Sequence, residues 1–250
     1  GNVGSRVQKL LEVLGVRVVA NDPPLAAAGE RSLVTLDEAL AQDIVCLHVP
    51  LTTDGPYPTH QMIAGETLGR MRDGALLVNT ARGDVIDGDS LVAELDRGRL
   101  HCALDVWPGE PRIDATLLRA ACVATPHVAG YSDDGKRLGT LMVYADFCRW
   151  AGLEPARTLP APGDPRPLDL SVAPDAVGKA LDATCFVRLH DTAMRELAEL
   201  PEAQRAAGFD RLRREYPTRR DFKGWRIHEA DAAAARLLGA LGFQVDAGEL

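Results

Sequence analysis

The sequence of 250 residues has few cysteines, a deficit of positive charge and no long apolar run. Its five cysteines lack a C-x-x-C spacing, which argues against a disulfide framework and against a zinc cluster. No stretch approaches the roughly 20 apolar residues of a membrane-spanning helix, and no charged-then-apolar signal segment opens the sequence. With 28 basic and 36 acidic residues, the net charge of −8 argues against binding nucleic acid or anionic membranes. We therefore expect a cytoplasmic protein without a metal site.

Apolar segments alternate with amphipathic ones along residues 1–151, and 46% hydrophobic residues suffice for a globular core. Val7, Leu10, Leu11 and Leu14 follow the spacing of a helix, which Gly15 ends. Further helices are predicted at 37–40, 90–97 and 139–150. Short buried strands are predicted at 16–20, 44–49, 75–80, 101–106 and 122–125. This alternation predicts an α/β fold, a doubly wound parallel sheet covered on both faces.

The composition changes after residue 151. Six prolines between residues 154 and 174 are too dense for a helix or a central strand, so 152–174 is predicted to be an extended linker. Residues 175–250 are predicted to form a small α+β domain, with a helix at 176–189, an Ala-rich helix at 230–241 and a short strand at 243–245. Because a domain of this size buries only a marginal core, we expect it to pack against a partner subunit or against the first domain.

The first residues match the second half of a dinucleotide-binding fingerprint. Gly1 and Gly4 precede the first helix, and Asp22 follows at the end of the predicted strand. An acid at that point accepts hydrogen bonds from a ribose diol and repels a 2′-phosphate, which favours NAD over NADP. On these features alone, the alternative is that Gly1–Gly4 form a helix N-cap turn and that Asp22 closes a Pro-Pro turn.

Three later segments are more specific. They read Asn79-Thr80-Ala81-Arg82-Gly83, Asp105-Val106-Trp107-Pro108-Gly109-Glu110-Pro111 and Thr125-Pro126-His127. In this order and spacing they resemble the D-isomer-specific 2-hydroxyacid dehydrogenases, over about residues 1–150. Within that superfamily, the run 54–59, the stretch Gly130-Tyr131-Ser132 and the C-terminal extension resemble the erythronate-4-phosphate dehydrogenase family.

The resemblance implies catalytic roles for Arg82, Glu110 and His127. An imidazole is a suitable base for the alcohol proton while hydride leaves for NAD, and Glu110 would fix its tautomer and stabilise the imidazolium. The Arg82 guanidinium would grip the substrate carboxylate through two parallel bonds. Taken singly, a histidine such as His127 is more often a structural cap, and the alternatives for Glu110 and Arg82 are a solvated loop acid and a surface turn.

Other site residues are also implied by the resemblance or by their position. The predicted cofactor-binding residues are Gly1, Asn2, Val3, Gly4, Asp22, Val49, Thr80, Ala81, Arg82, Asp105 and Gly130. Tyr131 and Lys136 are candidates for the substrate phosphate, with a packing role as the alternative. The remaining histidines show no ligand spacing, and the Arg-rich run 211–220 fits a solvated helix face or a phosphate contact across a dimer interface.

The resemblance implies NAD-dependent oxidation of 4-phospho-D-erythronate, a small phosphorylated hydroxy acid, to 2-oxo-3-hydroxy-4-phosphobutanoate in vitamin B6 synthesis. It also implies a homodimer formed through the C-terminal domain. Family members carry about a hundred further residues and a first strand before the Gly-rich turn, so we expect an N-terminally truncated sequence whose own activity is open. The alternatives are another D-2-hydroxyacid dehydrogenase, such as one acting on phosphoglycerate, and a non-catalytic NAD-binding or dimerisation fragment.

Overall fold

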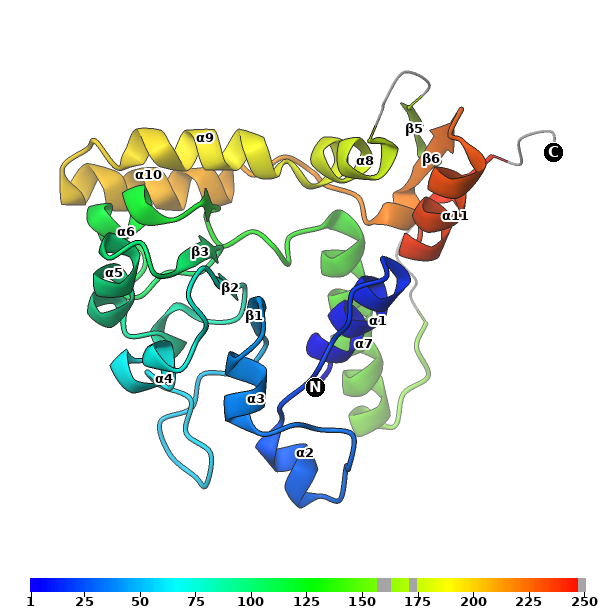
Figure 1. Cartoon of the computed structure of the whole chain (residues 1–250). Helices are drawn as coiled ribbons and strands as arrows, with labels where there is room; N and C mark the ends of the chain where they lie inside the picture. The colour runs from blue at the N-terminus through cyan, green and yellow to red at the C-terminus, as the bar shows by residue number, and fades with distance from the viewer. Residues whose placement is uncertain (157–162, 171–174, 247–250) are drawn as a thin grey trace. The chain divides into compact units, whose positions relative to one another are not determined.

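The computed structural model describes residues 1–156, 163–170 and 175–246. Their contacts divide the chain into two compact units, drawn in Figure 1. Unit 1 comprises Gly1–Ala129 and Val187–Tyr216, and unit 2 comprises Gly130–Phe186 and Pro217–Leu250. This division differs from the boundaries predicted at 151 and 175. Residues 175–250, here called the tail, do not stay together, because the segment Val187–Tyr216 packs with the first 129 residues.

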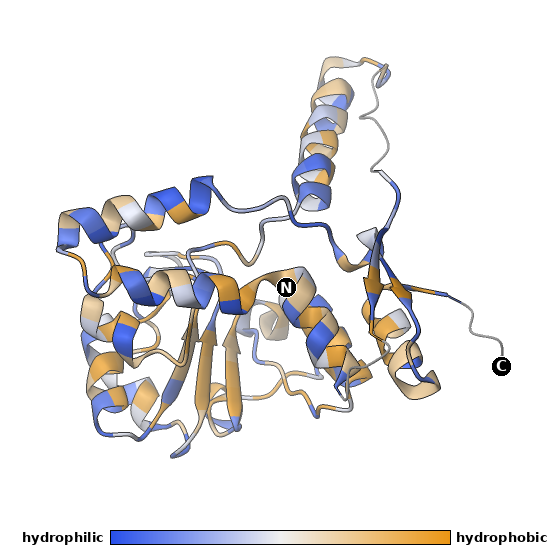
Figure 2. Ribbon diagram, turned by 90° about the horizontal axis from the view of Figure 1, so that it is seen from above, coloured by the Kyte–Doolittle hydropathy of each residue, from blue (hydrophilic) through white to orange (hydrophobic). Residues whose placement is uncertain are grey.

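Unit 1 is built on a four-stranded sheet in the order β1-β2-β3-β4. The strands are β1 (Ile44–Leu47), β2 (Leu76–Asn79), β3 (His101–Leu104) and β4 (Val123–Ala124), and every neighbouring pair is parallel. Figure 2 shows them as apolar segments, although one face of β1 is exposed at Ile44 and Cys46. The predicted parallel α/β fold is confirmed, and all four strands end at the same edge of the sheet.

Short helices connect these strands and are capped by their own sequence. They are α3 (Leu36–Leu40), α4 (Gly65–Gly69), the 3-10 turn η1 (Gly83–Val85), α5 (Gly88–Asp96) and α6 (Ala115–Ala120). Asp87 and Asp114 each accept a hydrogen bond from the helix that follows, from Ser90 N and Leu117 N. Leu77, Leu91 and Leu117 are almost completely buried, so the core lies between the sheet and these helices.

The N-terminal segment is less tightly packed. Helix α1 (Gly4–Val13) is confirmed but has no buried residue, and α2 (Pro23–Ala27) follows. The strand predicted at 16–20 is wrong, because no described strand pairs with it and Ala20 O accepts only one backbone hydrogen bond, from Val34 N. A strand needs a neighbour to satisfy its polar groups, and apolar composition alone does not provide one.

The helix predicted at 176–189 is also corrected, because Phe186 adopts a left-handed φ of 56° and divides it. Helix α8 (Ala176–Cys185) belongs to unit 2, whereas α9 (Val187–Leu197) and α10 (Glu202–Arg214) belong to unit 1. Met194, Leu197 and Phe209 join the buried core of unit 1. Part of the tail therefore completes the first domain, one of the two possibilities that its small size suggested.

Unit 2 contains α7 (Asp133–Ala151), α8, the 3-10 turn η2 (Phe222–Gly224), α11 (Ala232–Leu241) and a three-stranded parallel sheet. Its strands are β5 (Arg166–Asp169), β6 (Trp225–His228) and β7 (Gln244–Val245), with β6 in the centre. The linker predicted at 152–174 is therefore partly wrong, because β5 lies within it. Pro167 is compatible with this strand because β5 is at the edge, where a missing N–H is tolerated. Residues 157–162 and 171–174 of that prediction lie outside the described residues.

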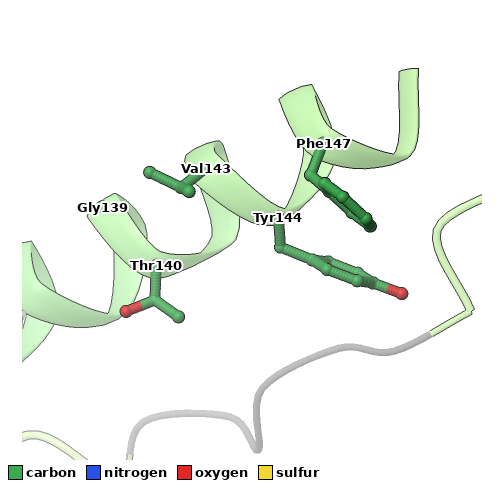
Figure 3. A pocket seen from close by; sticks show the side chains of 5 residues that line it. All are labelled: Gly139, Thr140, Val143, Tyr144 and Phe147. Carbon is green, nitrogen blue, oxygen red and sulfur yellow. The ribbon is translucent and has the colours of Figure 1, made fainter. Parts of the chain in front are cut away.

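Helix α7 presents an apolar face to solvent. Leu138, Met142, Val143, Phe147 and Trp150 are all more than half exposed. Figure 3 shows a groove along this helix, lined by Gly139, Thr140, Val143, Tyr144 and Phe147. Within the described part of the chain, no helix is both long and apolar enough to cross a bilayer.

Candidate active site

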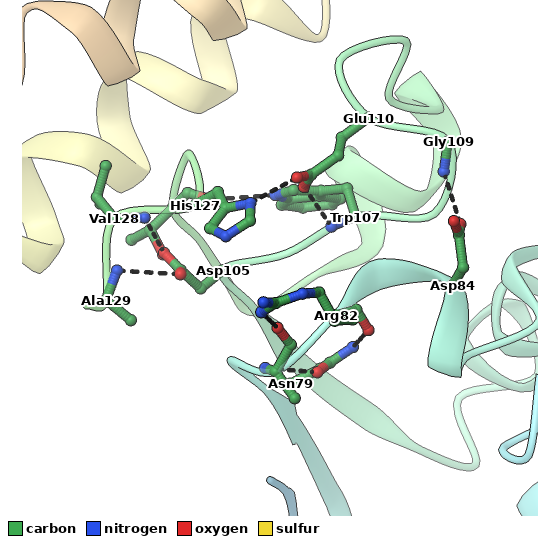
Figure 4. Close-up of polar contacts among 12 residues, drawn as sticks. Asn79, Arg82, Asp84, Asp105, Trp107, Gly109, Glu110, His127, Val128 and Ala129 are labelled. Atoms are coloured by element: carbon green, nitrogen blue, oxygen red, sulfur yellow. Dashed lines mark hydrogen bonds and ion pairs between the residues drawn. The ribbon is translucent and has the colours of Figure 1, made fainter. Parts of the chain in front are cut away.

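His127 and Glu110 form the central pair of the candidate site. Nδ1 of His127 lies 2.5 Å from Oε1 of Glu110, and both side chains are less than a third exposed. The second carboxylate oxygen of Glu110 accepts a hydrogen bond from Trp107 N at 3.1 Å (Figure 4). A carboxylate on Nδ1 orients the ring, assigns the proton to that nitrogen and leaves Nε2 as the basic atom.

Trp107 is the packing centre behind this pair. Its side chain is 1% exposed, and its indole N–H donates to Thr125 O at 3.0 Å. It therefore connects the loop after β3, which carries Glu110, to the loop after β4, which carries His127. The two loops follow neighbouring strands, so the parallel sheet places their functional groups at one edge.

Asp105 holds the His127 loop from inside. Its carboxylate accepts hydrogen bonds from Thr125 Oγ1, Val128 N and Ala129 N, at 2.6, 2.8 and 3.0 Å (Figure 4). The side chain is 4% exposed, and its backbone oxygen accepts from His127 N at 2.6 Å. His127 adopts a left-handed φ of 57°, which is unfavourable for a non-glycine residue and persists only where the surroundings fix it.

The Arg82 loop is fixed by Asn79 at the end of β2. The completely buried Asn79 amide accepts from Ala81 N at 3.0 Å and donates to Arg82 O at 2.9 Å. Arg82 itself is exposed, and its guanidinium donates to Ala81 O at 2.6 Å. A Cβ added to Gly83 would lie 2.0 Å from Trp107 O, so only glycine permits the two loops to approach this closely.

In the N-terminal segment, the Gly-rich turn lies close to Asp22, the acid that is predicted to bind the ribose. Asp22 Oδ2 lies 3.3 Å from the nitrogen of Gly1, and its Oδ1 caps α2 by accepting from Leu25 N. The turn leads directly into α1, whose first N–H groups are those that a pyrophosphate would meet. A Cβ added to Gly4 would reach ordinary contact with His48, at 3.5 Å.

The remaining predicted residues fall in three places. Asn2 and Val3 form the exposed turn before α1, and Val49 is partly buried against the core. Thr80 is exposed in the Arg82 loop. Gly130, Tyr131 and Lys136 belong to unit 2, where the Lys136 ammonium lies 4.5 Å from the centre of the Tyr131 ring. The structure thus brings Arg82, Asp105, Glu110 and His127 to one edge, and the ligand contacts of the whole set remain predictions.

Sequence reasoning gave no role to Asn79, Gly83, Asp84, Trp107 or Thr125, which the structure assigns to holding the site. Asp84 Oδ1 accepts from Gly109 N at 3.1 Å and so joins the Arg82 loop to the Glu110 loop. For Asn79, the sequence signal that could have indicated this role was a polar side chain at the end of a buried strand. Among the described residues, no three His, Cys, Asp or Glu side chains are placed to hold a metal ion.

The family model for the "D-isomer specific 2-hydroxyacid dehydrogenase, NAD binding domain" matches residues 1–129. The chain belongs to this family. Within it, the chain is 41% identical to the erythronate-4-phosphate dehydrogenase of Hahella chejuensis and 40% identical to that of Teredinibacter turnerae. Each alignment covers 98% of the chain and 67% of the relative, so the chain spans about two thirds of their length. A second model, the domain of unknown function DUF3410, matches residues 171–242.

Solved structures of this dehydrogenase family share the fold. A D-lactate dehydrogenase from Treponema pallidum is 28% identical, with a TM-score of 0.51 over 64% of this chain and 54% of the other. A D-isomer-specific 2-hydroxyacid dehydrogenase from Lactobacillus delbrueckii, described as an NAD-complexed form, is 26% identical, with a TM-score of 0.51 over 62% and 52%. Residues 1–129 are therefore an NAD-binding domain of Rossmann type, and the Gly1–Gly4 turn with Asp22 fits that cofactor.

Proposed function

We propose that the protein catalyses the NAD-dependent oxidation of 4-phospho-D-erythronate to 2-oxo-3-hydroxy-4-phosphobutanoate, a step of vitamin B6 synthesis. The proposal is carried by the His127–Glu110 pair, which lies at the same carboxyl edge of the sheet as the exposed Arg82. The substrate is taken from the names of the curated relatives, which match nearly the whole chain.

In this proposal, Nε2 of His127 takes the proton of the C2 hydroxyl while the C2 hydrogen leaves with its electron pair. NAD, when bound, supplies the acceptor for that hydride. The negative charge of Glu110 stabilises the imidazolium that forms, and the pair later releases the proton to water. Arg82 binds the substrate carboxylate, where a planar guanidinium can make two parallel bonds. Gly130 as a cofactor contact and Tyr131 as a phosphate contact belong to the same proposal.

The test uses the full-length gene product and compares His127→Gln with His101→Gln. His101 is exposed at the amino end of β3, so its replacement should leave the rate unchanged. His127→Gln should lower kcat by ~10²–10⁴, the usual contribution of a general base, with little change in NADH affinity. Near-normal turnover by His127→Gln would exclude the assigned base, and a preference for phosphoglycerate over 4-phosphoerythronate would exclude the assigned substrate.

We also propose a cytoplasmic homodimer formed through the C-terminal domain. Several apolar residues of the C-terminal part are buried within the chain and so are not available for an interface, namely Leu197, Ile227, Leu238 and Phe243. Leu189 on α9 is 59% exposed and is therefore the candidate contact.

Light scattering of the full-length protein at micromolar concentration should report a dimer, and Leu189→Glu should dissociate it. Met142→Glu, on the exposed face of α7 and outside residues 175–250, is the matched change. A monomeric wild-type protein contradicts the proposal, as does dissociation by Met142→Glu alone.

A further inference from the structure

The tail of the chain contacts the strand that leads to His127. Helix α9 lies along β4 and α6, and its Asp191 Oδ1 accepts a hydrogen bond from Ala124 N at 2.7 Å. Strand β4 is at the edge of the described sheet, so a carboxylate satisfies the N–H that a further strand would otherwise take. Ala124 precedes His127 by three residues, so this bond fixes the start of the loop that carries the base.

Arg195 fixes Asp191 in turn. Its Nη2 lies 2.9 Å from Asp191 Oδ1 and donates to Ala121 O at 2.6 Å, and its Nη1 donates to Leu118 O at 2.8 Å. The same guanidinium therefore holds the end of α6, the chain entering β4 and the carboxylate. Both side chains are about one third exposed, so the pair contributes little net stability, and its effect is chiefly geometric.

The segment that follows the loop is also held by tail residues, within unit 2. Arg220 Nε donates to Asp134 Oδ2 at 3.0 Å, and Asp221 N donates to the same oxygen at 2.9 Å. The carboxylate and guanidinium are 3% and 10% exposed. The backbone of Arg219 accepts from Asp133 N at 2.8 Å, which fixes the first turn of α7. Tail residues thus contact the chain both before and after the left-handed His127.

We propose that the tail braces the His127 loop, and that Asp191 is a positioning residue for the base. Asp105 fixes the loop itself, whereas Asp191 fixes the strand from which it departs. The strained backbone of His127 needs both, because a loop free to relax would turn Nε2 away from its working direction. This assigns a role to part of the domain of unknown function, and its kinetic readout depends on the proposed dehydrogenase activity.

The test compares Asp191→Ala, Asp191→Asn and Glu199→Ala in the full-length gene product. Glu199 also pairs with the first domain, through Arg119, but does not contact the loop. Asp191→Ala should lower kcat by about tenfold, the size expected when one hydrogen bond to a catalytic loop is lost, with the KM for NAD unchanged. Asp191→Asn keeps an acceptor oxygen and should restore most of the rate, and Glu199→Ala should be neutral.

Hydrogen exchange provides a readout that does not need activity. The amides of residues 124–129 should exchange faster in Asp191→Ala, and in Arg195→Met if Asp191→Ala does not fold. Unchanged exchange, or a kcat of Asp191→Ala equal to that of Glu199→Ala, would overturn the brace. His127→Gln separates the two hypotheses: if it retains activity the proposed function fails, and if it alone is inactive only the brace fails.

Discussion

Unit 1 contains two regions that are built in opposite ways: the edge of the sheet that carries the proposed catalytic residues Arg82, Glu110 and His127, here called the catalytic edge, and the Gly-rich N-terminal segment. At the catalytic edge, the buried Asn79 and Asp105 make several hydrogen bonds each, and the residues around them are held in one arrangement. In the N-terminal segment, α1 buries no residue and the apolar stretch 16–20 pairs with no described strand. The comparison teaches that the residues proposed for the chemical step are held by buried side chains of this chain, whereas the predicted cofactor-binding turn makes few contacts with the described residues.

Asp105→Ala should have the largest effect on stability. It removes the acceptor of three donors, of which Val128 N is buried, and such unsatisfied groups cost about 1–3 kcal/mol each. We expect the free energy of unfolding to fall by about 3 kcal/mol in urea denaturation. Asp105→Asn, which keeps the shape and one acceptor, is the control. A loss below about 1 kcal/mol for Asp105→Ala would show that the catalytic edge is not held as described.

Gly83→Ala should have the second-largest effect on stability. The new Cβ would overlap Trp107 O, a backbone atom that cannot move without shifting the Glu110 loop. Overpacking of this kind costs about 2 kcal/mol, and we expect kcat to fall as well because the loops of Arg82 and Glu110 separate. Thermal unfolding and steady-state rates of the full-length protein measure both. Gly88→Ala, where a Cβ would meet Pro108 at ordinary contact distance, is the matched change.

Asp22→Ser addresses the N-terminal segment directly. The carboxylate should repel the 2′-phosphate of NADPH, so its removal should narrow the preference for NADH over NADPH about tenfold, or ~1.4 kcal/mol. Fluorescence titration of both cofactors against the full-length protein measures this change. If the wild-type protein binds both equally, Asp22 does not select the cofactor.

The ion pair Asp134–Arg220 predicts a pH effect outside both regions. Burial, the largest single influence, raises the pKa of Asp134, but the hydrogen bonds from Arg220 and Asp221 N outweigh it and hold the pKa below its usual 3.8. A lowered folded-state pKa means that this stabilisation is present above about pH 4 and is lost as the pH falls through the folded-state pKa. The free energy of unfolding of the wild-type protein should therefore fall more than that of Asp134→Asn between pH 6 and pH 3. If urea denaturation shows equal losses of unfolding free energy for the wild-type protein and Asp134→Asn, this prediction is contradicted.

Gly4→Ala should have the smallest effect. The added Cβ would make an ordinary contact with His48, and alanine favours a helix over glycine. We expect the free energy of unfolding to change by less than about 0.5 kcal/mol, in contrast to Gly83→Ala. A loss as large as that of Gly83→Ala would mean that both regions are equally constrained.

The sequence alone predicted those strands and helices whose hydrophobic periodicity and flanking residues indicate the same element. The helix at α5, for example, has an aspartate cap and apolar residues on one side. It also sufficed for the pairing of Glu110 with His127, through the motif spacing of a known family. It failed for residues 16–20, because apolar composition does not say whether a neighbouring strand is present. Phe186 gave no signal either, since a left-handed φ at a bulky residue is set by its surroundings.

The positions that hold the site were harder to predict than the site itself. Asp191 lies 67 residues beyond Ala124, and no local pattern connects a helix carboxylate to the N–H of a distant strand. The local sequence was also misleading at Pro167. Its proline favoured a linker, whereas the folded chain places it in a strand at the edge of the small sheet. Spacing identifies groups that act together, and the contacts between remote segments come only from the folded chain.

The division of the tail at Phe186 has a consequence for inheritance. Residues 171–242 match one family model, yet 187–216 share a core with residues 1–129. A recombination event that joined the first 129 residues to an unrelated tail would remove Met194, Leu197 and Phe209 from that core and expose the surfaces they cover. Exchange between relatives is therefore expected to succeed only when the two segments are transferred together, so lineages should carry them as one unit despite the 57 residues that separate them in the gene product.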